Sequence, residues 1–265
     1  GKDALMKDLE YSEQERPIVA QFFTSKPELM EKAARLAVEL GFDGVDINMG
    51  CPDRSIEKQG AGAALIKNPE LAGELIERAM HGAGDLPVSV KTRIGYNKNE
   101  LEEWLPILLS KNPATIVIHA RTRKEMSKVP AQWDQIKRAV QIRNEMGGDT
   151  LIVGNGDVMD FDEARRRVTE TGADGVMFGR AIFGNPWFFD KCKKDVSIEE
   201  KLGTMIEHTK LFEELLPEKN FAIMKKHYKA YVHGWDGAKE LRMKLMETHN
   251  AREVELITEN YLSTL

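Results

Sequence analysis

Six short apolar runs, each ending in polar residues capable of chemistry, constrain the fold of this chain most strongly. They span residues 18–23, 44–48, 88–92, 115–119, 151–154 and 175–178. The runs are rich in β-branched residues and do not alternate, as expected for strands buried on both faces of a sheet. Stretches with helical spacing separate them, at 27–40, 69–80, 100–109, 133–145 and 160–171. This alternation predicts a parallel α/β sheet with right-handed crossovers.

The strand pattern stops after Pro186. Helical spacing continues at 197–216, 221–232, 238–248 and 254–261, with Ser197 as a candidate N-cap. We therefore expect a (β/α) domain over residues 1–190 and a helical domain over residues 191–265.

The number of strands raises a question about closure. Parallel strands followed by helices predict a TIM-type (β/α) barrel, but six strands cannot close with the tilt and shear of the eight-stranded form. Residues 1–16 are too few to hold two more βα units. We expect either an N-terminally incomplete barrel, with six of eight strands, or an open sheet.

Composition excludes several classes of protein. Two cysteines among 265 residues are too few for a disulfide framework, which predicts a reducing, cytoplasmic setting. The N-terminal residues do not resemble a signal peptide, and no apolar run approaches the ~20 residues of a spanning helix, so no membrane partner is expected. The net charge of −5 argues mildly against nucleic-acid binding, although a local basic patch can still contact phosphate.

Polar residues at the ends of the runs should converge, because all carboxyl ends of parallel strands lie on one face. Asn48 and Cys51 follow the second run within Asn-Met-Gly-Cys-Pro. A cysteine there can be a nucleophile, a metal ligand, a general acid or an inert packing residue. The Gly-Cys-Pro turn at a strand end favours a functional role, and the Asn48 amide suits the recognition of a polar ring.

Lys91 ends the third run. An ammonium group is costly to bury there without an anionic partner. A reduced flavin, which is anionic near N1 and O2, is one such partner. A salt bridge to Asp46 is the alternative.

His119 ends the fourth run, and Arg121 and Arg123 follow it. This grouping favours an anionic or polar ligand, with a hydrogen-bonded structural histidine as the alternative. Metal-ligand spacing is missing from the sequence, so we expect no metal site.

Two glycine-containing loops form a candidate phosphate site. Gly154-Asn155-Gly156-Asp157 precedes a predicted helix, and Gly179-Arg180 follows the next run. Glycines let backbone amides approach an anion, and a helix N-terminus attracts it. The alternative is a pair of tight turns with glycines at positive φ.

Order and spacing of these motifs resemble the tRNA-dihydrouridine synthases, from about residue 17 to the C-terminus. The resemblance rests on Gln21 in Val-Ala-Gln-Phe, Asp-Ile-Asn-Met-Gly-Cys-Pro at 46–52, Lys-Thr-Arg at 91–93, His-Ala-Arg-Thr at 119–122, Gly-Asn-Gly-Asp at 154–157, Gly-Arg-Ala at 179–181, Asn-Pro-Trp at 185–187 and Lys-Lys-His-Tyr at 225–228.

The resemblance implies an FMN-binding barrel followed by a helical RNA-binding domain. Such an enzyme reduces the C5–C6 bond of D-loop uridines in tRNA, with NADPH as electron donor, and no protein partner is implied. Cys51 would protonate C5 while the flavin delivers hydride to C6. FMN would be contacted by Gln21, Lys91 and His119 and, at its ribityl-phosphate end, by Asn155, Gly156, Asp157, Gly179 and Arg180. The uracil would be positioned by Asn48 and by Arg121 or Arg123, and tRNA phosphates would be contacted by Lys225, Lys226 and His227, with Lys229 and Arg242 beside them.

One feature departs from the resemblance. Family members carry two further N-terminal βα units, whose first strand places an Ala-Pro-Met-like motif under the flavin, and nothing here matches it. We therefore expect a partial version of such a protein. Two alternatives stay open: a flavin-dependent barrel reductase of a small molecule, similar to dihydroorotate dehydrogenase or old yellow enzyme, and a flavin-free tRNA-binding remnant.

Overall fold

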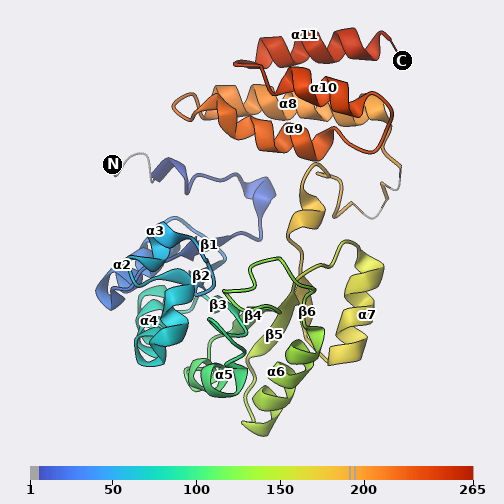
Figure 1. Ribbon diagram of the computed structural model, residues 1–265. Helices are drawn as coiled ribbons and strands as arrows, with labels where there is room; N and C mark the ends of the chain where they lie inside the picture. The colour runs from blue at the N-terminus through green and yellow to red at the C-terminus, as the bar shows by residue number, and fades with distance from the viewer. Residues whose placement is uncertain (1–5, 191, 194, 265) are drawn as a thin grey trace. The chain divides into compact units, whose positions relative to one another are not determined.

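The computed structural model describes residues 6–190, 192–193 and 195–264 (Figure 1). The chain divides into two compact units, Gly1–Phe178 and Gly179–Leu265. The sequence placed this boundary after residue 190, whereas the first unit of the structure ends directly after the sixth strand.

The first unit is built on six parallel strands whose order in the sheet is their order in the sequence. Sequential parallel order is the arrangement found around a (β/α) barrel. The α/β class and the six predicted strands are confirmed. The strands are β1 (Val19–Phe22), β2 (Gly44–Asn48), β3 (Val88–Arg93), β4 (Thr115–His119), β5 (Leu151–Asn155) and β6 (Gly175–Met177).

Helices connect successive strands of the first unit (Figure 1). Several begin where the sequence predicts: Pro27 and Pro69 occupy first-turn positions, and the Asp160 side chain accepts a hydrogen bond from Glu163 N at 2.7 Å. Gly172, with φ 74°, ends the last of them in the left-handed conformation. The helical elements are η1 (Glu13–Glu15), α2 (Pro27–Glu39), α3 (Arg54–Glu57), η2 (Gly62–Lys67), α4 (Pro69–Ala83), α5 (Leu101–Leu109), α6 (Trp133–Glu145) and α7 (Phe161–Thr171).

The two faces of the sheet differ in burial. Alternate side chains of a strand point to opposite faces, and residues such as Val45 and Ile118 are buried in the main apolar core. On β1 and β5, by contrast, Val19 and Leu151 are 49% and 47% exposed. Burial on both faces is therefore confirmed for β2 and β4 but wrong for β1, β5 and β6, because fewer neighbouring strands shield side chains toward the two edges of the sheet.

The second unit is helical and has its own core. Buried side chains from all its long helices, including Leu202, Tyr228, Leu241 and Val254, form one apolar cluster. The predicted C-terminal helical region is confirmed, and the Ser197 side chain caps its first long helix by accepting from Glu200 N at 3.2 Å. Its elements are η3 (Arg180–Ile182), α8 (Ile198–Leu215), η4 (Phe221–Met224), α9 (Lys225–Tyr231), α10 (Ala238–Leu245) and α11 (Ala251–Leu262). Across the described residues, no helix is both long enough and apolar enough to cross a membrane.

Candidate active site at the carboxyl ends of the strands

Strand register brings the predicted polar residues of the first unit to one edge of the sheet. Gln21, Asn48, His119 and Asn155 lie at or next to the last residue of their strands, and Lys91 lies two residues before the end of β3. Partners on neighbouring strands stand side by side. The pairs in register are Gln21 with Asp46, Asn48 with Lys91, Arg93 with His119, and His119 with Asn155. We call this the carboxyl edge.

The turn that carries Cys51 follows β2 at this edge. The Gly50–Cys51 peptide is held at both of its polar groups: Cys51 N donates to Asn48 Oδ1 at 2.9 Å, and Gly50 O accepts from Arg93 Nε at 2.7 Å. Cys51 O accepts from Ala63 N at 2.9 Å. The backbone on either side of the thiol is therefore fixed, while the Cys51 side chain remains partly exposed.

Gly62 shows how closely this turn is packed. It has φ +61°, and a Cβ there would lie 2.8 Å from Cys51 O. A side chain at this position would displace the turn, so glycine is required by both conformation and space.

Arg93 is a buried cation beside Cys51. It is 8% exposed, and its Nη1 donates to the carbonyls of Thr122 and Met126 at 3.3 Å. Arg93 therefore ties the Cys51 turn to the loop after β4. Burial lowers the pKa of Arg93, and the attraction of a Cys51 thiolate opposes that shift.

Lys91 is the second cation of the carboxyl edge. Burial, and then repulsion from Arg93, lower its pKa to about 8, whereas Asp46 acts in the opposite direction. Within the described part of the chain, no carboxylate comes within ion-pair distance of its ammonium group. Asp46 instead accepts hydrogen bonds from Gln21 Nε2 at 2.7 Å and Ser89 Oγ at 2.5 Å. The salt bridge offered as an alternative for Lys91 is thus not formed.

His119 is held by Arg121. Burial, followed by the charges of Arg93, Lys91 and Arg121, lowers the pKa of His119 to about 3, so its imidazole is neutral at physiological pH. Arg121 Nη1 lies 3.0 Å from His119 Nε2. Because a guanidinium can only donate, Nε2 is the acceptor and the proton resides on Nδ1.

Arg121 has little freedom to reach a ligand. It is 2% exposed; its guanidinium forms an ion pair with Asp157, and its Nε donates to Val129 O at 2.6 Å. Asp157 also accepts from Ala131 N at 2.9 Å. The geometry gives Arg121 and Asp157 a shared role in ordering the loop that follows β4.

Arg123 also has an internal partner. Its guanidinium forms a bidentate ion pair with Glu57 of α3, whose side chain is largely buried. Arg123 therefore links the loop after β4 to the short helix after the Cys51 turn.

A hydrogen bond and close packing account in part for the residues found in the Asn155–Gly156 loop. Asn155 Nδ2 donates to Met177 O at 2.9 Å, which fixes the end of β6. Gly156 has φ +133°, and a Cβ there would lie 2.8 Å from Ala131 Cβ. Gly179 and Arg180 follow β6 and open the second unit.

The predicted tRNA-contacting residues lie on α9 in the second unit. Among the described residues, the ammonium groups of Lys225, Lys226 and Lys229 have no ion-pair partner. By contrast, Lys210 of α8 pairs with Glu255. The three α9 lysines are therefore free to meet an external anion.

His227 and Arg242 differ from these lysines. The His227 ring stacks on Phe183, with centroids 5.8 Å apart, and meets His208 edge-on at 4.9 Å. Burial and then the neighbouring His208 lower the pKa of His227, which reduces its charge as a phosphate contact. Arg242 Nη1 donates to Val232 O at 2.8 Å and thereby supports the turn after α9.

The sequence suggested Asp46 only as a possible ion-pair partner of Lys91, and it gave no role to Arg93 or Glu57. Asp46 and Arg93 lie within otherwise apolar strands, and a buried charge requires partners. That signal could have marked both residues. Glu57 carried no signal, because its partner Arg123 lies 66 positions away in the sequence.

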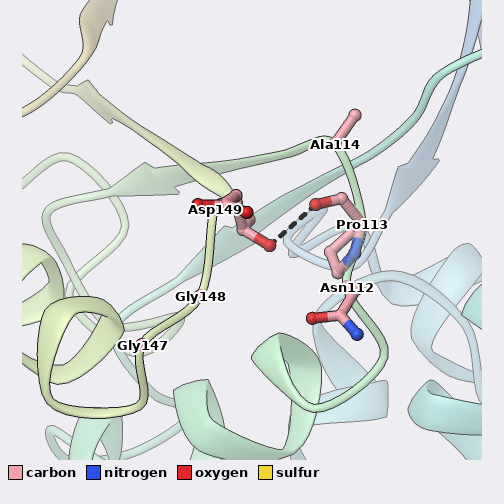
Figure 2. Close-up of a pocket in the computed structure, with 7 residues that line it drawn as sticks. Asn112, Pro113, Ala114, Gly147, Gly148 and Asp149 are labelled. Carbon is pink, nitrogen blue, oxygen red and sulfur yellow. Dashed lines mark hydrogen bonds between the residues drawn. The ribbon is translucent and has the colours of Figure 1, made fainter.

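A hollow of about 350 Å³ lies at the opposite edge of the sheet, where β4 and β5 begin (Figure 2). Thr150 Oγ1 donates across it to Pro113 O at 2.8 Å. In (β/α) barrels this amino-terminal edge serves stability and the carboxyl edge carries the chemistry. The hollow is lined by Asn112, Pro113, Ala114, Gly147, Gly148, Asp149 and Thr150.

Over the residues described, no group of three or more His, Cys, Asp or Glu side chains could hold a metal ion.

Comparison with known proteins gives matches over nearly the whole chain. The family model of dihydrouridine synthase matches residues 1–264. A probable tRNA-dihydrouridine synthase 2 of Bacillus subtilis (strain 168) is 41% identical over 264 residues, which cover 98% of this chain and 81% of that protein. A probable tRNA-dihydrouridine synthase of Staphylococcus epidermidis is 39% identical over 256 residues, covering 96% of this chain and 78% of that protein. The solved structure of morphinone reductase with tetrahydroNAD aligns with a TM-score of 0.43 and 17% identity, over 62% of this chain and 47% of that one.

Proposed function

The chain belongs to the dihydrouridine synthase family, and we propose that it reduces the C5–C6 double bond of D-loop uridines in tRNA, with Cys51 as the proton donor. The observation that carries this proposal is the Cys51 turn. It is held at both polar groups of the Gly50–Cys51 peptide, and it stands at the same edge of the sheet as Lys91 and His119.

The carboxyl edge fits a flavin. Lys91 offers a half-buried ammonium group that has no carboxylate partner among the described residues, and an anionic ring edge would supply one. His119, neutral and protonated on Nδ1, can donate one further hydrogen bond. FMN would be held by Lys91, His119 and Gln21 and, toward its phosphate, by Asn155 and Gly156. FMN would supply a hydride to C6 of the uracil.

Cys51 would complete the reduction by giving its proton to C5. Addition of hydride at C6 leaves an electron pair at C5, and this pair forms the new C–H bond with the thiol proton. A thiol is largely protonated near neutral pH and is a competent acid. The thiolate left behind would be reprotonated by solvent, so one hydride and one proton would be consumed per uridine.

Recognition of tRNA would fall partly to the second unit. The target uridine must leave its stack to reach the carboxyl edge, a form of base flipping. Lys225, Lys226 and Lys229 would hold phosphates of the folded tRNA, with shape rather than base sequence as the main determinant. NADPH would be the electron donor.

The direct test is nucleoside mass spectrometry of tRNA that lacks dihydrouridine, after incubation with the protein, FMN and NADPH. We expect a product two mass units heavier than uridine, formed in the D-loop and dependent on NADPH. Reduction of free uracil or orotate, with no product in tRNA, would instead support the small-molecule reductase.

A further inference from the structure

Asp46 is a buried carboxylate that the proposed chemistry does not use. It lies on β2 and is 7% exposed, and burial raises its pKa. Its two oxygens accept from different strands: Oδ2 from Gln21 on β1 at 2.7 Å, and Oδ1 from Ser89 on β3 at 2.5 Å. Burial of a carboxylate costs free energy, so Asp46 is expected to organise the groups that surround it.

Two side-chain amides continue from Asp46 toward the thiol. Gln21 Oε1 accepts from Asn48 Nδ2 at 2.9 Å. Asn48 Oδ1 in turn accepts from Gly50 N at 3.1 Å and Cys51 N at 2.9 Å. Asp46, Gln21 and Asn48 therefore form an unbroken relay that ends on the backbone of the Cys51 turn. We call it the amide relay.

The direction of the amide relay is set at one end. An amide has a donor end and an acceptor end of nearly equal size and can face either way, whereas an ionised carboxylate can only accept. Asp46 therefore compels Gln21 to present its NH₂ group, so that Oε1 faces Asn48. Asn48 must then present its NH₂ to Gln21 and its oxygen to the turn. If both amides were reversed, Asn48 would direct N–H donors at the N–H groups of Gly50 and Cys51.

We propose that Asp46 is a positioning residue for the reaction: it fixes the direction of the amide relay and thereby holds the Cys51 turn in the orientation that protonates C5. This inference rests on the proposed function for its catalytic consequence, but the orientation of the turn can be measured without catalysis. Asp46 acts through Gln21 and Asn48 and touches neither substrate nor thiol.

The decisive variant is Asp46→Asn, which keeps the size of the side chain but adds a donor, so that it no longer enforces one direction. The matched control is Asp43→Asn. Asp43 is also an acceptor near the start of β2, for Ile18 N at 2.7 Å and Arg16 Nη1 at 2.7 Å, but it is not part of the amide relay. Both variants remove one carboxylate from the same region, so a general loss of stability would affect both.

Hydrogen exchange of a single amide gives the readout. Protein labelled with ¹⁵N-cysteine has two cysteine amides: Cys51 N, bonded to Asn48 Oδ1, and Cys192 N, bonded to Asp190 Oδ1 at 2.9 Å. We expect Asp46→Asn to accelerate exchange of the Cys51 amide about five- to tenfold, the effect of losing one ordinary hydrogen bond. The Cys192 amide should not change, and Asp43→Asn should change neither.

Activity supplies the second readout. Asp46→Asn should lower kcat for dihydrouridine formation about tenfold while KM for tRNA and reduction of the flavin by NADPH stay unchanged, because only proton donation depends on the turn. Unaltered exchange at Cys51, or altered exchange with unaltered kcat, overturns the positioning role. If the wild type forms no dihydrouridine, the proposed function fails, and the exchange experiment alone decides whether the amide relay holds the turn. Should Asp46→Asn not fold, Gln21→Met interrupts the same relay, and exchange of the Cys51 amide is then the only readout, because Gln21 is also placed at the flavin: faster exchange is expected, and unaltered exchange overturns the positioning role.

Discussion

The two units of the molecule treat their charged side chains in opposite ways. At the carboxyl edge of the first unit, Arg93 and Arg121 are buried and bonded to backbone carbonyls or to a carboxylate. On α9 of the second unit, Lys226 and Lys229 are exposed and have no ion-pair partner within the described residues. The first arrangement fixes geometry, and the second leaves charge available.

This difference matches the two requirements of the proposed function, proton transfer and tRNA binding. Protonation at one carbon atom requires a thiol held within a fraction of an ångström, which satisfied internal bonds supply. Holding a folded polyanion requires mobile cations that release counterions, and preformed ion pairs would oppose that. Variants in the first unit should therefore change chemistry or cofactor binding, and variants on α9 should change tRNA affinity.

The largest effect is expected at Cys51. Cys51→Ala removes the proton donor, and dihydrouridine formation should fall by about 10²- to 10⁴-fold, the range typical for loss of a general acid. FMN binding, followed by flavin absorbance after gel filtration, should be retained. Loss of the flavin together with the activity would mean that Cys51 maintains the cofactor site instead.

Replacement of Lys91 should change both FMN affinity and the pH dependence of the free energy of unfolding. Its pKa of about 8 lies below the ordinary lysine value of 10.5, so the folded state binds fewer protons than the unfolded state between these pH values. The free energy of unfolding of the flavin-free protein should therefore rise between pH 8 and 10.5, by up to about 3 kcal/mol. Lys91→Met should remove this rise, increase stability at pH 7 and weaken FMN binding. Unfolding in urea at several pH values and flavin titration measure the two effects, and unchanged FMN affinity would exclude charge neutralisation by Lys91.

His119 should make the free energy of unfolding depend on pH in the acid range, whereas Lys91 does so in the alkaline range. Its pKa of about 3 in the folded state lies below the ordinary value of 6.5, so the unfolded state binds more protons between these values. The stability it contributes is complete above pH 6.5 and is lost as the pH falls, by about 2 kcal/mol between pH 7 and pH 5. His119→Gln can still accept from Arg121 and should lose less stability over this interval. Equal losses in the variant and the wild type would show that His119 is not held neutral.

The smallest effect is expected on α9. Replacement of Lys225, Lys226 and Lys229 by alanine should raise KM for tRNA about tenfold and lower the slope of log affinity against log salt by about two. Neither kcat nor FMN binding should change. A matched replacement of Lys210, which is paired with Glu255, should leave tRNA affinity almost unchanged. If both replacements had the same effect, the free cations of α9 would have no special role.

Much of the fold was predictable because strands and helices have different apolar periods. β2, β4 and α6 begin and end at the predicted residues. The short elements α3 and η2 were missed, since they hold too few residues for a period to appear. Residues of the carboxyl edge were predictable from one rule, that parallel strands end on the same side.

The partners of those residues were not predictable. Arg93 bonds to three carbonyls from two loops, and Arg123 pairs with a glutamate on the short helix α3. Such bonds depend on which loops, distant in the sequence, meet in the folded protein. The spacing of residues in the sequence does not indicate which loops these are. The sequence could mark a buried charge as costly, but it could not say which neighbour satisfies it.

The most direct test of the account separates the two half-reactions of the flavin in wild-type protein and in Cys51→Ala. NADPH is first used to bleach the flavin absorbance near about 450 nm, and excess tRNA lacking dihydrouridine is then mixed in under anaerobic conditions. We expect NADPH to reduce the flavin equally fast in both proteins, and tRNA to restore the absorbance rapidly only in the wild type. Equally rapid reoxidation of Cys51→Ala by tRNA would contradict the assignment of Cys51 as the proton donor.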